Sequence, residues 1–544
     1  MITRLRVTNF RALEAVDIPF SPLTAIVGPN GVGKTSILRA IDMLLGSAWP
    51  SMRSIRVPQD FTRFEPGRDL VIEVYFNPPV IHSDAMRTEH EIAGFRFVCR
   101  PYKKSGKWGS AGDLHDDFEP LDAKGSAISA ATRWDKGQKP TFGPLRVSTG
   151  MREQQRLLFI DHRRSLSQHL PTARGSILSR LFEPARKEFT ADLPTKASFK
   201  DKYEAAMNVI RSPQIQNIEE TIEGTAKRML GFLGERAVDD IKIGFGFADP
   251  ANPFSSLRLL YTENGMEIPG EELGLGIQSA MVIGVFEAFR QLGSNVGTIV
   301  IEEPEMYLHP QAQRYFYSLL RELAESGKCQ VVYSTHSPVF GDVAAFESIR
   351  LIRKEPGMLA KASFVRDTPD RVFLESQRKA QKMQTGFDAA RNELLFARRA
   401  ILVEGPGDRL AVQLVAQRLG KDADAEDLAI ISCGAKSALL FFIRTCKALE
   451  IPCIVLHDTD IYPESGTPQE IRKIQKENAA ARVLNQKIAD LSKDVIVCDP
   501  TLEGLLGVGR RATDKPMKVV DAIEKLPDSH LPDPVVRAVT LLFS

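Results

Sequence analysis

The sequence predicts an α/β protein of more than one domain, and three observations lead to this prediction. An apolar strand at Thr24–Val27 runs through a Gly-rich loop directly into an amphipathic helix pattern that begins at Lys34. From about residue 398 onward, short apolar strands alternate with helices, which is typical of a parallel sheet. At 544 residues the chain is too long for a single hydrophobic core, so about two to four domains are expected.

Composition restricts the class of protein. The chain is 43% hydrophobic and 26% charged, as in ordinary globular proteins, and its net charge of +2 gives no overall basic signature. Nucleic-acid binding would therefore have to come from local patches. The six cysteines show no Cys-x-x-Cys spacing, which argues against a zinc site or a disulfide framework. The N-terminus has no signal-peptide pattern, and no apolar run reaches about 18 residues, so we expect a cytoplasmic protein.

The loop Gly28–Thr35 has the Gly-x-x-x-x-Gly-Lys-Thr spacing of a phosphate-binding loop. Its glycines let backbone N–H groups surround phosphates, and the N-terminus of the following helix favours an anion. Lys34 is expected to reach the β- and γ-phosphates of ATP, and the Thr35 hydroxyl to bind Mg²⁺. A fortuitous Gly-rich turn is the alternative, which the flanking strand and helix disfavour. The expected nucleotide-binding residues of the loop are Asn30, Gly31, Gly33, Lys34, Thr35 and Ser36.

Between this loop and residue 298 the pattern is less regular. Residues 103–145 favour hairpins and loops. From about 163 to 235 the pattern is helical, and two interpretations stay open: an insertion that makes subunit contacts, or a helical layer of the same domain. Four segments are predicted to contain strands: residues 1–27, Leu70–Phe76, Arg146–Val147 and Leu157–Asp161.

A second apolar strand, Thr298–Ile301, ends in the acids Glu302 and Glu303. In a nucleotide site, one such acid can hold Mg²⁺ and the other can polarise the attacking water. Buried strands often end in charged residues, so the pattern gains its meaning from its surroundings. These are a Gly-rich segment upstream, a Pro-Glu-containing turn directly after, and a later strand with a polar end: Leu273–Ser279, Pro304–Pro310 and Val331–Ser337.

In this order the motifs resemble an ABC-type ATPase of the SMC and RecF kind, in which two heads enclose two nucleotides. The resemblance implies that Glu302 binds the metal, that Glu303 is the catalytic base and that His336 is the switch histidine. It also implies that the Leu273–Ser279 segment, with Gly276, faces the γ-phosphate of the other head.

The chain departs from that family at Leu275, where the signature has a serine. Leucine cannot donate a hydrogen bond to a γ-phosphate, which argues against fast hydrolysis driven by dimerisation. The backbone N–H groups of Gly274 and Gly276 can still contribute. Gln59 is a candidate for the glutamine loop of the family.

Five acids follow the predicted strands of the second half: Glu404, Asp408, Asp458, Asp460 and Glu503. Parallel strands end at one edge of a sheet, so these carboxylates are expected to meet there and to repel one another unless cations neutralise them. This implies Mg²⁺ or Mn²⁺, and a pair of such ions is suited to phosphodiester cleavage. Asp458 and Asp460 are expected to project to the same side of an extended segment and to share a metal. For a lone Asp-x-Asp, a solvated strand end is the commoner explanation.

The ordered set of Glu-Gly-x-x-Asp, Asp-x-Asp and a later Glu resembles a Toprim domain, the fold shared by topoisomerases, primases and certain nucleases. An ABC-type ATPase joined to a Toprim domain resembles the OLD (overcoming lysogenisation defect) family of nucleases and is similar to the nuclease subunit of the Gabija anti-phage system. Further matching pieces are Asn9-Phe10-Arg11, Asp60-Phe61, Leu308-His309-Pro310, Glu393–Ala397 and Lys515-Pro516.

By this resemblance the five acids hold metal ions, with Glu404 and Asp458 taking part in catalysis. Lys515 would stabilise charge on the cleaved phosphate, although an ordinary surface lysine is nearly as good an explanation. His457 is interpreted as a structural neighbour of the acids, and Ala435 departs from a family glycine.

The predicted organisation is an ABC-type P-loop ATPase domain with a helical insertion, followed by a parallel-sheet α/β Toprim domain. Its parts are 1–162, the first part of the ATPase domain; 163–235, a helical insertion and candidate dimerisation region; 236–365, the second part of the ATPase domain; 366–397, a helical connector; and 398–544, the Toprim nuclease domain.

The leading functional hypothesis is an ATP-binding, metal-dependent DNA endonuclease that acts as a homodimer or higher homo-oligomer, used in anti-phage defence or DNA processing. A helicase or other defence protein encoded nearby is a candidate partner. The alternative is a nucleotide-gated DNA tether with a silent Toprim domain, which the complete acid set disfavours. No room is left for the strand-passage domain of a topoisomerase, and the cysteines exclude the zinc module of a primase.

Overall fold

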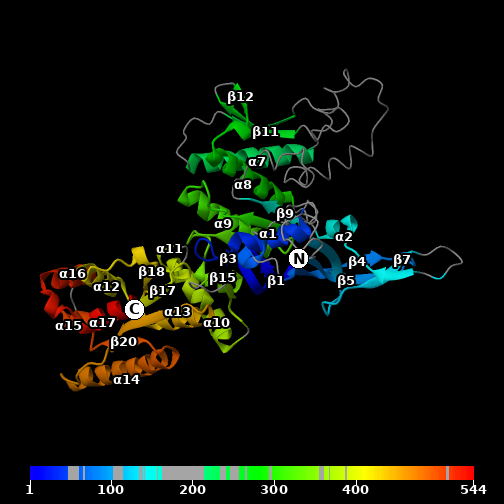
Figure 1. Cartoon of the computed structure of the whole chain (residues 1–544). Helices are drawn as coiled ribbons and strands as arrows, with labels where there is room; N and C mark the ends of the chain where they lie inside the picture. Colours follow the sequence, from blue (N-terminus) through cyan, green and yellow to red (C-terminus); the bar gives the residue numbers. More distant parts are fainter. Residues whose placement is uncertain are drawn as a thin grey trace. The chain divides into compact units, whose positions relative to one another are not determined.

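The computed structural model describes most of the chain, and Figure 1 traces it from end to end. Gln59 and most of the predicted helical segment 163–235 lie outside the described residues. The described ranges are 1–46, 60–64, 68–101, 114–133, 139, 141–155, 157–161, 213–232, 240–245, 257–263, 266–292, 297–354, 360–366, 368–385, 389–509 and 514–544. The chain divides into two compact units, Met1–Phe340 with Ile352–Ala362, and Gly341–Leu351 with Ser363–Ser544.

The first unit is built on a six-stranded sheet in the order β16-β15-β3-β14-β13-β9. Strands β9, β13, β14 and β3 pair parallel to one another, so their carboxyl ends meet at one edge. The central strands are almost wholly buried, as expected of parallel strands covered on both faces. The strands are β3 Leu23–Val27, β9 Leu157–Ile160, β13 Gly297–Glu302, β14 Cys329–Thr335, β15 Ile349–Arg353 and β16 Lys361–Ser363.

Helix α1 (Lys34–Leu45) packs between this sheet and a second, antiparallel sheet of order β2-β1-β4-β5-β6. Its apolar residues recur at helical spacing, and Ile37, Leu38 and Ile41 are fully buried in the core that the two sheets share. The predicted strands in residues 1–27 and at Leu70–Phe76 are confirmed. The strands are β1 Ile2–Phe10, β2 Leu13–Pro19, β4 Leu70–Ser83, β5 Glu89–Pro101 and β6 Leu114–Leu121.

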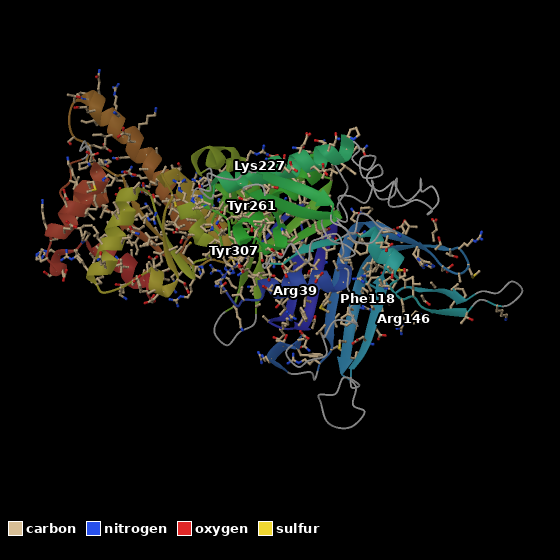
Figure 2. All side chains as sticks on the ribbon, turned by 90° about the horizontal axis from the view of Figure 1, so that it is seen from above. Arg39, Phe118, Arg146, Lys227, Tyr261 and Tyr307 are labelled. Atoms are coloured by element: carbon tan, nitrogen blue, oxygen red, sulfur yellow. The ribbon has the colours of Figure 1, made fainter. Side chains whose placement is uncertain are left out.

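The predicted strand at Arg146–Val147 is wrong, whereas the one at Leu157 is confirmed as β9. The Val147 N–H donates one hydrogen bond to the Phe118 carbonyl, 3.1 Å away, but the chain then turns into α2 (Thr149–Gln154), whose first turn is capped by Ser148. Figure 2 shows Arg146 near Phe118. A hairpin of β7 (Ser129–Arg133) and β8 (Thr141–Pro144) lies in the region predicted to form hairpins.

The described part of the predicted helical segment is one helix, α7 (Pro213–Phe232), which packs along α8 (Leu275–Leu292). Gly284 permits this close approach, because a Cβ there would stand 2.6 Å from the Ile222 carbonyl oxygen. A three-stranded antiparallel sheet, which was not anticipated from the sequence, precedes α8 and comprises β10 Asp240–Phe245, β11 Leu257–Glu263 and β12 Met266–Pro269. Helix α9 (Pro310–Glu325) packs against β3 and β14.

The second unit is built on a four-stranded sheet of order β18-β17-β19-β20, in which every neighbouring pair is parallel. This confirms the predicted parallel sheet and its strands. The strands are β17 Arg399–Val403, β18 Leu428–Ser432, β19 Cys453–Asp458 and β20 Val495–Cys498. The helices are α10 Pro369–Thr385, α11 Ala389–Asn392, α12 Pro406–Arg418, α13 Lys436–Ala448, α14 Pro468–Leu491, α15 Leu502–Leu505, α16 Lys515–Lys525 and α17 Asp533–Leu542.

Within residues 366–397 the structure describes the helices α10 and α11 and a short 3-10 helix, Glu393–Leu395, and these residues group with the second unit. The finer predicted domain limits stay predictions. All six cysteines are free thiols, and five of them are buried. None of the described helices is long and apolar enough to cross a membrane.

Candidate active sites

The phosphate-binding loop has the backbone geometry that its glycines permit. Gly28, Gly31 and Gly33 have φ angles of 148°, 75° and 108°, which residues with a side chain rarely adopt. A Cβ at Gly28 would stand only 2.2 Å from the Ile352 carbonyl oxygen, so this position has no room for a side chain. The loop joins β3 to α1, which begins at Lys34 with Gly33 as its N-cap residue.

The Lys34 side chain folds back over its own loop. Its ammonium donates to the carbonyl oxygens of Gly28 and Pro29, both 2.7 Å away, and lies 3.4 Å from Nδ1 of His336. Burial lowers the pKa of Lys34 to about 8, against the raising effect of Glu303 and Glu305. The loop therefore contains a buried ammonium whose present partners are neutral carbonyls, and an anionic phosphate would be a stronger partner.

Three predicted ATPase residues meet at the carboxyl edge of the six-stranded sheet. Glu303 follows β13, and its Oε1 lies 3.3 Å from Nε2 of His336, which follows β14. Glu303 has a φ of 49°, and its backbone N–H is held by Ser334, through the carbonyl at 3.0 Å and the hydroxyl at 3.3 Å. Burial, and next the neighbouring Lys34 ammonium, lower the pKa of His336. Lys34, Glu303 and His336 thus form one contact chain, as an acid–base site requires.

Sequence reasoning assigned no role to Glu305, although its motif was singled out. Its Oε1 accepts three hydrogen bonds from the segment that carries the histidine: from Thr335 Oγ1 at 2.9 Å, His336 N at 2.6 Å and Ser337 N at 3.1 Å. Burial raises the pKa of Glu305. Glu305 therefore fixes the backbone of His336 relative to the turn that carries Glu303.

The other predicted nucleotide residues lie around this contact chain or on α8. Asn30, Gly31, Thr35 and Ser36 belong to the loop and the first turn of α1, and Glu302 is 3% exposed at the end of β13. Gly276 lies in the first turn of α8, next to Leu275, which is 40% exposed. The proposed role of Gly276 towards a second head stays a prediction.

Replacing Lys34 with alanine is expected to abolish ATP binding, because the phosphates lose their cation while the loop backbone remains. The measurement is equilibrium binding of a fluorescent ATP analogue, with thermal unfolding as the control for folding. Unchanged affinity in a folded variant would remove the assignment of this loop.

Three of the five acids predicted in the second half are held by hydrogen bonds at the carboxyl edge of the four-stranded sheet. Glu404 follows β17, and its Oε1 accepts a hydrogen bond from the Asp458 N–H at 2.9 Å. Asp408, in the first turn of α12, accepts from the Gly405 N–H at 2.9 Å. Asp458 ends β19, and its Oδ1 accepts from the Leu502 N–H at 2.9 Å. Neighbouring strands and the helix that follows β17 thus place three carboxylates together, as predicted.

Burial and mutual repulsion dominate the electrostatics of this edge. Burial raises the pKa of Glu404 to about 7, of Asp408 to about 6 and of Asp458 to about 8, and neighbouring acids add to each of these shifts. Glu503 is among the acids that raise the pKa of Asp408 and of Asp458. Such a site disfavours its own negative charge, and a divalent cation would reverse that preference.

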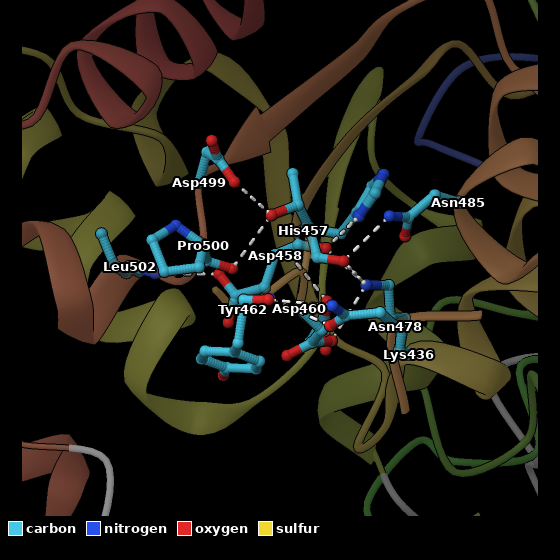
Figure 3. Close-up of polar contacts among 12 residues, drawn as sticks. Lys436, His457, Asp458, Asp460, Tyr462, Asn478, Asn485, Asp499, Pro500 and Leu502 are labelled. Atoms are coloured by element: carbon cyan, nitrogen blue, oxygen red, sulfur yellow. Dashed lines mark hydrogen bonds and ion pairs between the residues drawn. The ribbon is translucent and has the colours of Figure 1, made fainter. Parts of the chain in front are cut away.

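The expectation that Asp458 and Asp460 lie along an extended segment is wrong. Asp460 has a φ of 52°, so the chain leaves the strand conformation directly after β19. Figure 3 shows the contacts of this turn. The Lys436 ammonium, whose side chain is 9% exposed, lies 2.9 Å from Asp460 Oδ2 and also donates to the carbonyl of Asp458. An internal cation, missed by sequence reasoning, therefore neutralises Asp460.

Two further predicted residues each lie beside one of these acids. The Lys515 ammonium, in the first residue of α16, lies 3.6 Å from Glu503 Oε1, so this lysine is not isolated on the surface. His457 is 3% exposed, and its Nδ1 lies 2.7 Å from the carbonyl oxygen of Asp458, in keeping with a structural neighbour. Burial lowers the pKa of His457. No group of three or more His, Cys, Asp or Glu side chains in the described ranges is already arranged around a point where an ion could sit.

The two sites define an ATPase joined to a Toprim-type domain, and comparison with known proteins agrees. Residues 1–96 and 146–340 match the family described as AAA ATPase domain, and residues 395–460 match the family described as "Overcoming lysogenization defect protein-like, TOPRIM domain". The chain is 49% identical over 546 residues to the OLD nuclease of Thermus scotoductus, covering 99% of this chain and 98% of that protein. The chain belongs to the OLD nuclease family, enzymes that combine an ATPase domain with a Toprim nuclease domain.

More distant relatives agree with this assignment. The Old nuclease of Escherichia phage P2 is 22% identical, over 84% of this chain and 77% of that protein. Endonuclease GajA of Bacillus cereus is also 22% identical, over 40% of this chain and 35% of that protein. The predicted fold class and family are thereby confirmed.

Proposed function

We propose that this nuclease is an ATP-binding, divalent-metal-dependent DNA endonuclease that cuts duplex DNA at the Toprim edge, under regulation by the ATPase domain. We assign it to anti-phage defence or DNA processing, on the strength of its resemblance to OLD and Gabija nucleases. The observation that carries the proposal is the convergence of five acids and two lysines at one edge of the four-stranded sheet.

The donor set fits hard divalent cations. Carboxylate oxygens are the ligands that Mg²⁺ and Mn²⁺ prefer, and the acids of this edge are buried close enough to raise one another's pKa. The residues that would hold the ions are Glu404, Asp408, Asp458, Asp460 and Glu503. Bound there, a pair of such ions would polarise the scissile phosphate and supply a hydroxide nucleophile.

The chain's own residues supply the remaining functions. Lys515, beside Glu503, would place an ammonium where charge develops on the cleaved phosphate. Glu404 orients the end of β19 by accepting the Asp458 N–H, so these two acids are fixed relative to each other. In the ATPase domain, Lys34 would bind the phosphates, Glu303 would activate water and His336 would contact the γ-phosphate. Thr35 and Glu302 would hold the Mg²⁺ that accompanies ATP.

We expect at least a homodimer, because ABC-type heads work in pairs and Gly276 would then face the nucleotide of the second head. Sedimentation velocity with and without ATP measures this. A monomer at micromolar concentration in both conditions would contradict the proposed assembly.

Supercoiled plasmid incubated with Mg²⁺ or Mn²⁺, with and without ATP, tests the proposed activity. Nicked or linear product that disappears with EDTA is expected. If wild-type protein binds DNA but never cuts it under these conditions, the rival function is favoured, in which the ATPase domain gates a DNA tether and Lys436 keeps Asp460 neutralised.

A further inference from the structure

A cleft adjoins the acid edge of the second unit. It has a volume of ≈ 500 Å³ and lies between the N-terminus of α13, the turn after β19, and α14. Asp460 and Lys436 line the end nearest the acids, so the cleft opens directly beside the proposed reaction centre. Ligand-binding clefts in proteins have volumes of roughly 300–1,000 Å³, so this one is large enough for one nucleotide.

One face of α14 forms the far wall. Glu477, Ala480, Ala481 and Leu484 line the cleft, and their spacing of three, four and seven residues places them on a single helix face. Two of these residues, Ala480 and Ala481, carry only methyl side chains and so fill little of the cleft. The neighbouring Ala479 is exposed but does not line the cleft.

An aromatic side chain, Tyr462, forms part of the same lining, and its backbone is firmly held. Asn478 of α14, only 2% exposed, donates from Nδ2 to the Tyr462 carbonyl at 2.8 Å and accepts the Tyr462 N–H at 3.0 Å (Figure 3). Two turns further along the same face of α14, Asn485 donates to the Thr459 carbonyl at 2.9 Å. These amides fix the turn against α14, so Tyr462 and the alanines form a preorganised apolar lining.

The charged residues that line the cleft are Lys436, Asp460 and Glu477, and further cations lie on the exposed surface of α14. Lys436 supplies a buried ammonium at the acid end. Helix α14 carries five basic and three acidic residues, a net charge of +2 (5 − 3), and all five basic side chains are exposed: Arg472, Lys473, Lys476, Arg482 and Lys487. Exposed cations on the same helix as an apolar, aromatic-lined surface are a combination by which proteins hold a nucleic-acid strand.

We propose that this cleft seats one nucleotide of the DNA strand being cut, the nucleotide adjacent to the scissile phosphate. Its sugar and base would lie against Tyr462 and the alanine face of α14, and its phosphate would lie towards Lys436 and Asp460. The inference rests on the proposed nuclease function and adds to it a subsite for the substrate.

The test introduces the same large side chain at two neighbouring exposed positions of α14, one that lines the cleft and one outside it. Ala480→Phe places a ring in the cleft, whereas Ala479→Phe places the same ring on the same helix outside it. DNA affinity is measured by fluorescence anisotropy of a short duplex, beside KM and kcat for its cleavage in Mn²⁺ and the ATPase rate. We expect Ala480→Phe to weaken DNA binding and to raise KM by about tenfold or more, since an occupied subsite forfeits contacts of the size of base stacking. Ala479→Phe should stay within about twofold of wild type.

A second pair of variants covers the case in which both phenylalanines disturb α14. Tyr462→Ser removes the ring from the cleft and should raise KM, and Tyr462→Phe, which keeps the ring, should raise KM less. If Ala480→Phe leaves both DNA affinity and KM unchanged, the subsite is overturned. Where that variant disturbs the helix, the same result with Tyr462→Ser overturns the subsite. The nuclease centre stands in either case as long as wild type cuts. If wild type never cuts, the proposed function fails, and the anisotropy data alone decide whether the cleft binds DNA.

Discussion

Replacing Asp458 with alanine is expected to slow DNA cleavage by at least about a thousandfold and to leave ATP hydrolysis unchanged. The carboxylate ends β19 at the point where Glu404, Asp408 and Glu503 also converge. Loss of a metal ligand should remove several kcal/mol of transition-state stabilisation, and each decade in rate corresponds to about 1.4 kcal/mol. ATP hydrolysis should persist because its residues belong to the other compact unit. Plasmid cleavage and phosphate release are measured on the same preparations.

Two controls make this result interpretable. Asp458 Oδ1 accepts the Leu502 N–H, so alanine also removes a structural hydrogen bond, whereas Asp458→Asn keeps the acceptor and should be nearly as inactive. Asp494 is an exposed acid just before β20, at the opposite edge of the same sheet, and Asp494→Ala should cut like wild type. If the Asp458 variants cut as well as wild type, the nuclease centre lies elsewhere.

Replacing Glu303 with glutamine is expected to lower ATP hydrolysis by about two orders of magnitude or more while ATP still binds. The Glu303 carboxylate lies 3.3 Å from His336 at the end of β13, where it can accept a proton from the attacking water, and an amide cannot. Steady-state hydrolysis and equilibrium ATP binding are compared with those of wild type.

Glu325→Gln is the matched control, because it makes the same chemical change on the exposed surface of α9, where Glu325 is 62% exposed beside Arg321. It should hydrolyse ATP at the wild-type rate. Full turnover by Glu303→Gln would assign the general base to another residue.

The sequence predicts those features of the protein that depend on several characteristic residues close together in the chain, or on the direction of parallel strands. The phosphate-binding loop combines glycines, lysine and threonine within eight residues, and parallel strands bring acids such as Glu404 and Asp458 to one edge whatever the loops do. The predicted strand at Arg146–Val147 failed because two residues are too few to determine whether the chain pairs or turns into a helix, here one capped by Ser148.

The supporting residues could not be predicted because their roles arise from contacts distant in sequence. Glu305 holds His336 across 31 positions, and Lys436 meets Asp460 across 24. The left-handed turn at Asp460 depends on the same tertiary contacts, so a strand pattern alone gave the wrong geometry there. Asn478 has an ordinary helical neighbourhood, and only its near-complete burial against the Tyr462 backbone reveals its role.

The most direct test of the central claim, that the acid edge is a metal-dependent nuclease centre, is Mn²⁺ binding by nucleotide-free protein. Isothermal titration of wild type is compared with Asp408→Asn, which keeps an acceptor for the Gly405 N–H but loses the charge. The prediction is that wild type binds Mn²⁺ and cuts DNA over the same concentration range, and that Asp408→Asn loses both. Equal Mn²⁺ binding by the two proteins, or cleavage by wild type in EDTA, would contradict it.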